Sequence, residues 1–363
     1  MAEKFSKFRD PGTGIQVFLT PVVASSSSSG LASILLPLFA ALGVVRAIVG
    51  GTSWGLYLLF GWKGFLRVVL FALGFVRLAV DEVSSGSGKR RETTSAVGAG
   101  GNGGGKGEVV LANHSSWIDL LVLSYLYPGI QFVVPVIEES TMAASTSTSE
   151  SGAKKRGTPK ANAMSANTRI ATPTASTSGT NTTAPAILGY TILTLPSALR
   201  FIGALPPTRT ALPAGTTHIH ATLSATLSST TAPLAFFPEL VTSNNRALLH
   251  ITTLPRTSPT LARCHITTLK YSPPTRTSIS SVYTVGHPTG SIYTHLAQIL
   301  FTSSPARGVS LKHSDLSAGE GGEAWADQVV ASMSNMARLK QTSIDWWSKR
   351  EFLTMVRARS KRA

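Results

Sequence analysis

The residues that stand out for their chemistry are a histidine and an aspartate five positions apart, His114 and Asp119. They follow an apolar run at 109–112, which predicts a buried strand, and precede a run that predicts a helix. If Ser116 is the N-cap of that helix, the Asp119 carboxylate can turn back toward the cap and the imidazole. An aspartate that holds one ring nitrogen leaves the other free to take a proton from a hydroxyl. The alternative interpretation is that Ser116 and Asp119 only cap the helix.

A second polar group follows a strand-like apolar run at 234–237. Glu239 is the only acidic residue between positions 151 and 314, in a stretch rich in Arg and Lys, so its carboxylate lies in a positive field. Hydroxyl, amide and guanidinium groups follow within a few positions, and such groups bind phosphate or glycerol oxygens. These residues are Thr242, Ser243, Asn244, Asn245 and Arg246. A polar turn between two sheet elements is the alternative.

The elements that must position these side chains alternate in type. Apolar runs at 130–136 and 261–271 predict two further buried strands, and an amphipathic pattern at 325–353 predicts a helix containing Trp346, Trp347 and Phe352. Arg209 follows a Pro-Pro turn and adds a cation at the end of another apolar stretch. The order of elements predicts an α/β fold with a mixed sheet flanked by helices.

Composition limits the classes of function. Of 363 residues, 43% are apolar and only 14% charged, so the chain is more hydrophobic and less charged than an ordinary soluble domain. The net charge of +16 indicates an anionic partner. The aromatic residues lie in apolar runs and no nucleic-acid-binding motif is present, so a membrane surface or a phosphorylated substrate is favoured over nucleic acid. One cysteine, Cys264, excludes an internal disulfide, and His218 and His220 lack a third ligand, so no metal site is predicted.

The N-terminal part of the chain predicts membrane attachment. After a polar tail at 1–30, residues 31–83 contain two apolar segments, separated by an uncharged Gly-Gly-Thr-Ser turn at 50–53. On a helical wheel Lys63, Arg67 and Arg77 lie in one narrow arc, as in a helix in the headgroup layer. A hairpin or re-entrant anchor is favoured over a single span, and the alternative is a soluble amphipathic helix.

Three further segments are predicted from composition. Residues 84–107 are a Gly/Ser linker, 138–183 a disordered insertion in a surface loop, and 354–363 a basic tail. The G-x-S-x-G match at 51–55 lies between membrane-type segments rather than between a strand and a helix, so it does not indicate a hydrolase elbow. The G-x-G-x-x-G match at 98–103 lies in the linker and does not indicate a dinucleotide site.

Two of these groups resemble the conserved blocks of a known family. Residues 113–119, with His114 and Asp119, look like the H-x4-D block of the glycerolipid acyltransferases, which include the lysophosphatidic acid acyltransferases. Phe237-Pro238-Glu239 and residues 242–246 are similar to that family's F-P-E-G-T-T-S-N-G-R block. The resemblance spans about 109–352 and implies a glycerol-3-phosphate acyltransferase-like fold for an acyltransferase domain at 108–353.

Weaker matches and departures accompany this resemblance. Residues 205–209 and 269–271 lie where the family has its second and fourth blocks, and 345–352 look like the tail of a fungal-type branch. The family's first glycine after the glutamate is Leu240 here and its second is Asn245; asparagine tolerates a positive φ, whereas leucine does so only with strain. The fourth block lacks the expected proline. Backbone contact with phosphate at Leu240 is therefore the least secure part of the match.

The resemblance implies acyl transfer from acyl-CoA, as co-substrate and with no other cofactor, to the hydroxyl of a lysophospholipid. His114 would be the general base and Asp119 its partner, while Arg209, Glu239, Thr242, Ser243, Asn244 and Arg246 would bind the acceptor. Lysophosphatidic acid is the preferred acceptor; lysophospholipids with ethanolamine or choline head groups, a catalytically inactive lipid-binding protein and a membrane-bound hydrolase are the alternatives.

The sequence also contains a clue to sidedness. Asn113-His114-Ser115 is an N-glycosylation sequon inside the expected site, and a glycan there would obstruct it. The site is therefore expected to face the cytosol. The expected location is a membrane, of the endoplasmic reticulum or of a lipid droplet.

Overall fold

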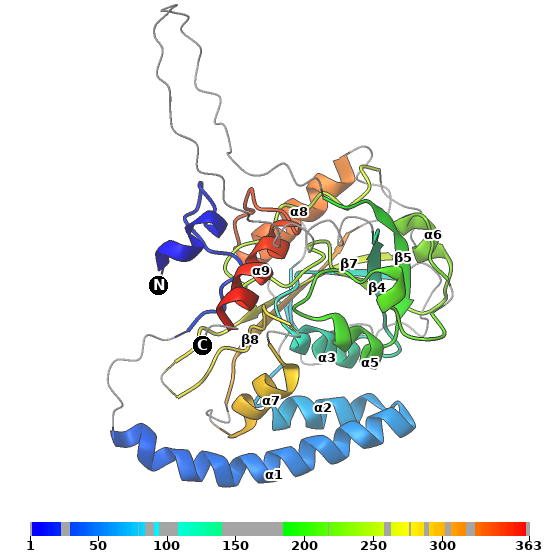
Figure 1. Cartoon of the computed structure of the whole chain (residues 1–363). Coiled ribbons are helices and arrows are strands. Elements are labelled where there is room, and N and C mark those ends of the chain that lie inside the picture. Colours follow the sequence, from blue (N-terminus) through cyan, green and yellow to red (C-terminus); the bar gives the residue numbers. More distant parts are fainter. Residues whose placement is uncertain are drawn as a thin grey trace, which may run out of the picture.

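A mixed sheet of eight strands forms the centre of the protein (Figure 1). The computed structural model describes residues 2–22, 30–78, 80–83, 91–93, 108–139, 184–216, 218–257, 263–275, 277–286, 290–301, 306–316 and 324–360. The strands are β1 (Val80–Glu82), β2 (Arg91–Thr93), β3 (Glu108–Ala112), β4 (Gln131–Ile137), β5 (Ile187–Leu193), β6 (Leu234–Phe236), β7 (Arg263–Tyr271) and β8 (Val309–Leu316).

The strands lie in the order β2-β1-β8-β7-β3-β6-β4-β5. At the centre β3 pairs in parallel with β6 and β7, and β4 pairs in parallel with β6. The carboxyl ends of β3, β6 and β7 therefore meet at one edge of the sheet, where side chains from distant parts of the sequence come together. The α/β class and the four strands expected from the apolar runs are confirmed; the specific acyltransferase fold stays a prediction.

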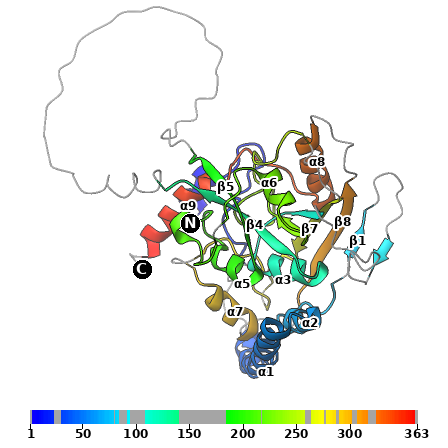
Figure 2. The same ribbon diagram turned by 90° about the vertical axis from the view of Figure 1, so that its right-hand side faces the viewer.

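Alternate residues of these strands face two separate cores, as the two-residue strand period requires. Figure 2 shows helices on both sides of the sheet. On one face Val110, Ala235 and Leu269 pack against helices below the sheet, and on the other Leu111, Phe236 and Ile266 pack against helices above it. The lower helices are α1 (Gly30–Phe60), α2 (Lys63–Ala72), α3 (Trp117–Leu126), α5 (Leu195–Ala198) and α7 (Ile292–Phe301). On the other face lie α6 (Leu223–Ser228), α8 (Trp325–Ala337), α9 (Ser348–Ser360) and the 3-10 turn η1 (Ala2–Phe8). The 3-10 turn η3 (Leu199–Phe201) packs with α5 on the lower core, and η4 (Arg209–Ala211) buries no side chain.

The N-terminal helices form a hairpin, but the prediction that it turns at residues 50–53 is wrong. Helix α1 continues through Gly50 and Gly51, and the chain turns at Gly61, which has a φ of +67°. Gly43 packs against the backbone at Leu300 in α7, and a Cβ at Gly50 would lie 3.1 Å from the Cβ of Ala72 in α2. The glycines therefore allow close helix packing rather than a turn.

The expected arc of three cations is also wrong. Helix α2 ends at Ala72, so Arg77 lies outside it, and the Arg67 guanidinium donates to the carbonyls of Phe75 and Val76 at 2.9 and 2.5 Å. Arg46, in the middle of α1, is buried and donates to the Ala72 carbonyl at 2.6 Å. Arg46 thus ties the middle of α1 to the C-terminal end of α2, and Arg67 ties α2 to the segment that follows it.

Two terminal segments also differ from expectation. The residues expected as a tail include Phe5, Phe8 and Phe18, whose rings lie 5.5–5.7 Å from that of Phe352 in α9. The helix expected at 325–353 is two helices, because α8 ends at Arg338 in the left-handed region, at a φ of +51°. The connection after α8 forms backbone hydrogen bonds with Leu248 and His250 instead of continuing the helix.

Several expectations lie largely outside the described residues. They are the insertion at 138–183, the G-x-G-x-x-G match at 98–103 and most of the linker at 84–107, from which only β2 is described. The G-x-S-x-G match at 51–55 lies within α1, in agreement with its rejection as a hydrolase elbow.

Candidate active site

His114 lies in the turn between the carboxyl end of β3 and the start of α3. Ser116 caps α3, its hydroxyl accepting from the Ile118 amide at 3.3 Å, and Asp119 completes a capping box. The Asp119 Oδ2 atom accepts from the amides of Ser115 and Ser116 at 2.7 and 2.8 Å, and lies 3.2 Å from Nδ1 of His114. The capping geometry and the histidine contact expected from the sequence are therefore both present, and one does not exclude the other.

The second oxygen of Asp119 is also occupied. Tyr271, the last residue of β7, donates its hydroxyl to Asp119 Oδ1 at 2.5 Å. Burial and the neighbouring carboxylate raise the pKa of Tyr271 well above its usual value, so that the phenol keeps its proton and remains a donor. The carboxylate is buried, and its four contacts hold it as an acceptor on the imidazole.

The imidazole of His114 is fixed on several sides. Its ring stacks on that of Phe237, with centroids 4.1 Å apart, and its backbone amide donates to Glu239 at 2.8 Å. Burial lowers the pKa of His114 below 6.5, and the Asp119 carboxylate opposes that shift. The ring is therefore neutral near pH 7. Among the described residues Nε2 has no hydrogen-bond partner, so this atom is available as a base.

Glu239 lies directly beneath this turn. It is 1% exposed, and its two carboxylate oxygens accept from the amides of His114 and Leu249 at 2.8 and 2.9 Å. Burial raises the pKa of Glu239 to about 7, although the two amides favour the ionised form. These bonds give the carboxylate a positioning role. Its predicted contact with an acceptor is not tested by this geometry.

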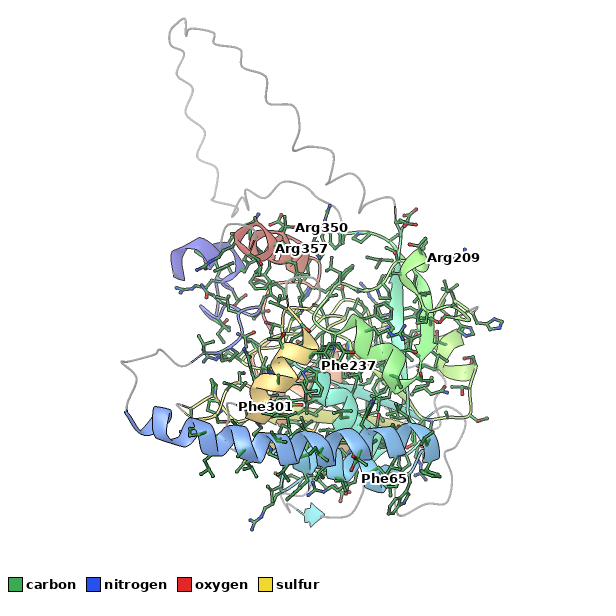
Figure 3. All side chains as sticks on the ribbon, turned by 60° about the horizontal axis from the view of Figure 1, so that its bottom comes forward. Phe65, Arg209, Phe237, Phe301, Arg350 and Arg357 are labelled. Carbon is green, nitrogen blue, oxygen red and sulfur yellow. The ribbon has the colours of Figure 1, made fainter. Side chains whose placement is uncertain are left out.

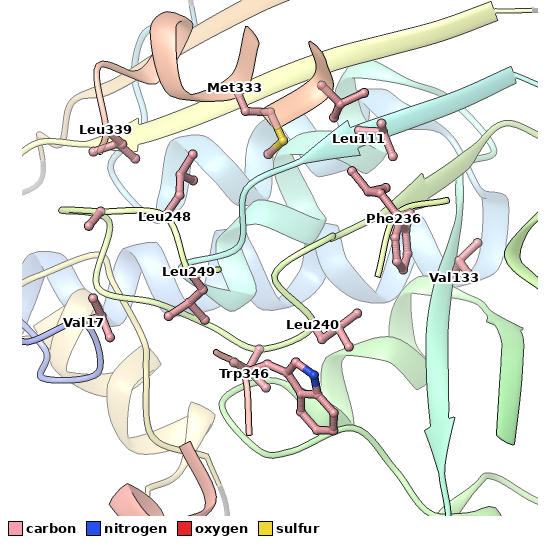
Figure 4. Close-up of a cluster of buried hydrophobic side chains, with 14 of the residues drawn as sticks. Val17, Leu111, Val133, Phe236, Leu240, Leu248, Leu249, Met333, Leu339 and Trp346 are labelled. Carbon is pink, nitrogen blue, oxygen red and sulfur yellow. The ribbon is translucent and has the colours of Figure 1, made fainter. Parts of the chain in front are cut away.

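The loop after Glu239 takes the conformation that glycine would favour. Leu240 and Asn245 have φ values of +57° and +60°, at the two positions where the resembled family has glycine. The Leu240 side chain packs in the upper core, beside Trp346 in Figure 4. Burial of this side chain offsets a strained backbone of about 1–2 kcal/mol.

The polar residues of this loop are buried and engaged with the protein. Ser243 donates its amide to the His114 carbonyl at 2.9 Å, and Asn244 donates its side-chain amide to the Gln16 carbonyl at 2.6 Å. Thr242 accepts from Lys349 Nζ through both its carbonyl and its hydroxyl, at 2.8 and 2.7 Å. Acceptor binding by these side chains stays a prediction; the observed contact with the His114 turn is that of Ser243.

Lys349 was not predicted as part of the site. It comes from α9 and is 0% exposed. Burial disfavours the charged ammonium and lowers the pKa of Lys349 well below its usual value, and the Glu239 carboxylate opposes this shift. The run at 345–352 was noted only as a family-like tail. Its signal in the sequence was a single lysine between Trp346-Trp347 and Phe352.

An apolar pocket opens beside His114. Its lining comes from the His114 turn, α3, β4, the segment around η3 and the loop after β6. Arg209 follows the lining residue Pro207 by two positions and is exposed, at the periphery of the molecule in Figure 3. The lining residues are His114, Leu120, Phe132, Val133, Val134, Pro135, Ala198, Phe201, Ile202, Leu205, Pro206, Pro207, Phe237 and Leu240. Arg246 is also exposed, at the end of the loop that holds His114. The pocket therefore places the His114 side chain against an apolar lining.

The sequon residue Asn113 is part of the same framework. Its side chain is 1% exposed and bonds to the Leu269 carbonyl and amide at 3.0 and 2.8 Å. Asn245 donates to the same carbonyl at 2.9 Å and to the Ser115 hydroxyl at 2.8 Å. A glycan on Asn113 is incompatible with this packing. Cys264 is buried.

Comparison with known proteins gives one significant match. No family model and no solved structure matches the chain. Over 132 residues the chain is 33% identical to a protein of Schizosaccharomyces pombe (strain 972 / ATCC 24843) named "Putative lysophosphatidic acid:oleoyl-CoA acyltransferase". The matched region is 34% of this chain and 42% of the relative. The chain is thus similar to an acyltransferase-type protein over about a third of its length, and the activity of the whole protein is a matter for proposal.

Proposed function

We propose that this protein transfers an acyl group from acyl-CoA to the free hydroxyl of a lysophospholipid, with lysophosphatidic acid as the preferred acceptor and phosphatidic acid as product. The observation that carries the proposal is the buried His114–Asp119 pair, whose unpartnered Nε2 lies at an apolar pocket. The similarity to the Schizosaccharomyces pombe protein supports the same reaction class.

In the proposed reaction the residues move one proton. His114 Nε2 takes the proton of the acceptor hydroxyl as its oxygen attacks the thioester carbon, and Asp119 stabilises the resulting imidazolium. The new ester C–O bond forms, the C–S bond breaks, and the CoA thiolate takes the proton back from the imidazolium. No acyl-enzyme forms, and acyl-CoA serves as co-substrate without a further cofactor.

Acceptor binding is proposed from charge and position. Arg209 and Arg246 are exposed guanidiniums on the segments that flank the pocket and hold the site, and guanidinium suits the double hydrogen bond that phosphate offers. Acceptor binding by Glu239, Thr242, Ser243 and Asn244 remains part of the proposal, and their observed bonds go to the protein itself. The apolar lining of the pocket suits an acyl chain.

The helical hairpin is proposed as the membrane attachment. In α1, Pro37–Phe60 is long and apolar enough to cross a membrane by length and composition, and it is the only such segment among the described residues. Figure 1 shows α1 along the underside of the domain, below α2 and α7, with α7 contacting it through Gly43. The side chains on its free face are exposed and apolar: Leu38, Leu42, Val45, Ile48 and Val49.

The proposal is tested with labelled oleoyl-CoA and a panel of lysophospholipids, using membranes that contain the protein. Labelled phospholipid that forms only when an acceptor is present supports acyl transfer, and the most reactive head group names the acceptor. Free fatty acid released at the same rate without acceptor would mean a hydrolase. Lipid binding without turnover would support the second candidate, an inactive lipid-binding protein, which the strained Leu240 at a family glycine position favours.

A further inference from the structure

The sheet face that packs on α3 carries a second polar cluster. His265 comes from β7, and His313 and Asp315 come from β8. The antiparallel register places His265 opposite Asp315 and Thr267 opposite His313, so alternate side chains of both strands point to the same face. One donor atom from each of His265, His313 and Asp315 lies within 4.8 Å of the others.

The two imidazoles are oriented as metal ligands are. Nδ1 of His265 and Nε2 of His313 both point at Asp315 Oδ1, at 2.5 and 2.9 Å. The other nitrogens are already held: His265 Nε2 lies 2.9 Å from Glu108, and His313 Nδ1 lies 3.0 Å from the Tyr127 hydroxyl. Histidines that bind metals use their second ring nitrogen in this way, because the hydrogen bond fixes the tautomer and the ring plane.

We propose that His265, His313 and Asp315 bind one divalent transition metal ion, with Zn²⁺ the best match, and with water as the fourth ligand. Two imidazoles and a carboxylate suit Zn²⁺ at bond lengths of about 2.0–2.2 Å, which places the ligand atoms roughly 3.3 Å apart. The Asp315 oxygen, 2.5 and 2.9 Å from the two ring nitrogens, has to move outward by less than about 1 Å to reach that spacing. The two nitrogens, which lie within 4.8 Å of each other, have to approach by up to about 1.5 Å. Its side chain is 67% exposed, so it has room to move and leaves a path for the ion.

The competing explanation is a purely hydrogen-bonded network. In that case His265 is an imidazolium between the carboxylates of Glu108 and Asp315, since only the charged ring has two donors. Burial lowers the pKa of His265, but the two carboxylates outweigh it and raise the pKa, which favours the charged ring of the network. A metal ion at Nδ1 would have to displace that proton. The two explanations differ in their response to zinc. Zinc should raise the unfolding temperature if the cluster is a metal site and leave it unchanged if the cluster is only a hydrogen-bonded network.

The cluster is separate from the proposed active site. Tyr127 follows the last turn of α3, whereas His114 precedes the first, and a ten-residue helix is about 15 Å long. The ion would tie β7 to β8, with Glu108 of β3 behind it, and would act on stability rather than on acyl transfer. Its test therefore does not depend on whether the protein is an acyltransferase.

The test uses the full chain in detergent micelles, without a histidine tag and stripped by a chelator. Titration calorimetry with Zn²⁺ should give a stoichiometry of one ion per chain, and scanning calorimetry should give a higher unfolding temperature with Zn²⁺. Mg²⁺ should neither bind nor raise the unfolding temperature. Asp315→Ala, at the exposed rim, should weaken zinc binding more than a hundredfold. Glu108→Gln should weaken it about 10–100-fold, because it removes only the support of a ligand.

His250→Gln serves as the matched control, because it removes an exposed imidazole outside the cluster and should leave the zinc affinity unchanged. Failure of the wild-type chain to bind zinc, or equal affinity in Asp315→Ala and His250→Gln, would overturn the proposal and leave the hydrogen-bonded network as the explanation.

Discussion

At the scale of single residues, Tyr271 sets the electrostatic state of the proposed catalytic pair, His114 and Asp119. Its hydroxyl donates to Asp119 and reaches no pocket-lining residue, so it acts through the carboxylate. Tyr271→Phe removes that donor and leaves more negative charge facing His114, which raises the pKa of the imidazole. We therefore expect kcat to fall about tenfold with KM nearly unchanged, and the acid limb of the pH–rate profile to move to higher pH from a wild-type position below 6.5.

Tyr283→Phe is the control for that experiment. Tyr283 is also a buried tyrosine, but among the described residues its hydroxyl has no hydrogen-bond partner. It should leave the pH profile unchanged. A Tyr271→Phe enzyme whose acid limb stays at the wild-type pH would show that the hydroxyl does not influence His114.

Leu240 gives a second prediction at this scale. At ordinary positions alanine is more stable than glycine by about 0.5–1 kcal/mol, but at a φ of +57° the Cβ is strained. Leu240→Gly should therefore have a free energy of unfolding about 1 kcal/mol higher than that of Leu240→Ala, although both lose the buried side chain. Denaturant unfolding of the two variants measures the difference. The usual order, with alanine the more stable, would mean that the backbone relaxes out of this conformation in the variants.

Much of the residue-scale geometry could be predicted from the sequence. The spacing of Ser116 and Asp119 gives the capping box, and His114 one turn earlier is then within reach of the carboxylate. Tyr271 and Lys349 could not be placed, because their contacts join residues 152 and 107 positions apart and depend on strand order. Neither contact has a local pattern.

At the scale of elements, α9 holds the loop that supports His114. Lys349→Met keeps most of the buried stem but leaves the carbonyl and hydroxyl of Thr242 without their donor. We expect the free energy of unfolding to fall by about 1–3 kcal/mol, as for a buried polar group that loses its partner, and kcat/KM to fall with it. Denaturant unfolding and steady-state kinetics measure the two effects.

Lys7→Met is the matched control. Lys7 is an exposed lysine in η1 that pairs at 2.6 Å with Glu351 of α9, the helix that contains Lys349. Surface pairs of this kind contribute little, so the change should stay within about 0.5 kcal/mol. Equal effects of the two substitutions would contradict a special role for the buried lysine.

The element boundaries that sequence patterns missed have a common cause. Gly50 and Gly51 resemble a turn, but a long helix survives there because α2 and α7 pack closely against α1. The helix expected at 325–353 is interrupted because the connection after Arg338 pairs with Leu248. In both places tertiary contacts outweighed the local preference.

At the scale of the whole molecule, the exposed apolar side chains gather on the N-terminal hairpin. Leu59, Phe60 and Trp62 surround its turn and are 78%, 70% and 61% exposed. A fully buried side chain of this kind contributes roughly 1.5–3 kcal/mol, so the turn would add substantially to the proposed binding at a lipid surface. The high apolar content and the net charge of +16 predicted this property, but the position of the turn came only from the structure.

The double substitution Leu59→Ser with Phe60→Ser should therefore weaken binding to anionic phospholipid vesicles at least tenfold in a sedimentation assay. The control pair is Leu188→Ser with Met355→Ser, which are exposed apolar residues on β5 and α9. Those changes should leave vesicle binding unchanged. A comparable loss in both pairs would contradict attachment through the hairpin.

The central claim, that His114 is the base of an acyl transfer, is tested most directly by the rate of acceptor-dependent phospholipid formation from labelled oleoyl-CoA. The wild type is compared with His114→Ala and with His250→Ala, which removes an exposed histidine outside the site. The account predicts wild-type activity in His250→Ala and a loss of about 10²–10⁴-fold in folded, membrane-bound His114→Ala. Undiminished transfer by His114→Ala, or no transfer by the wild type with any lysophospholipid, would contradict it.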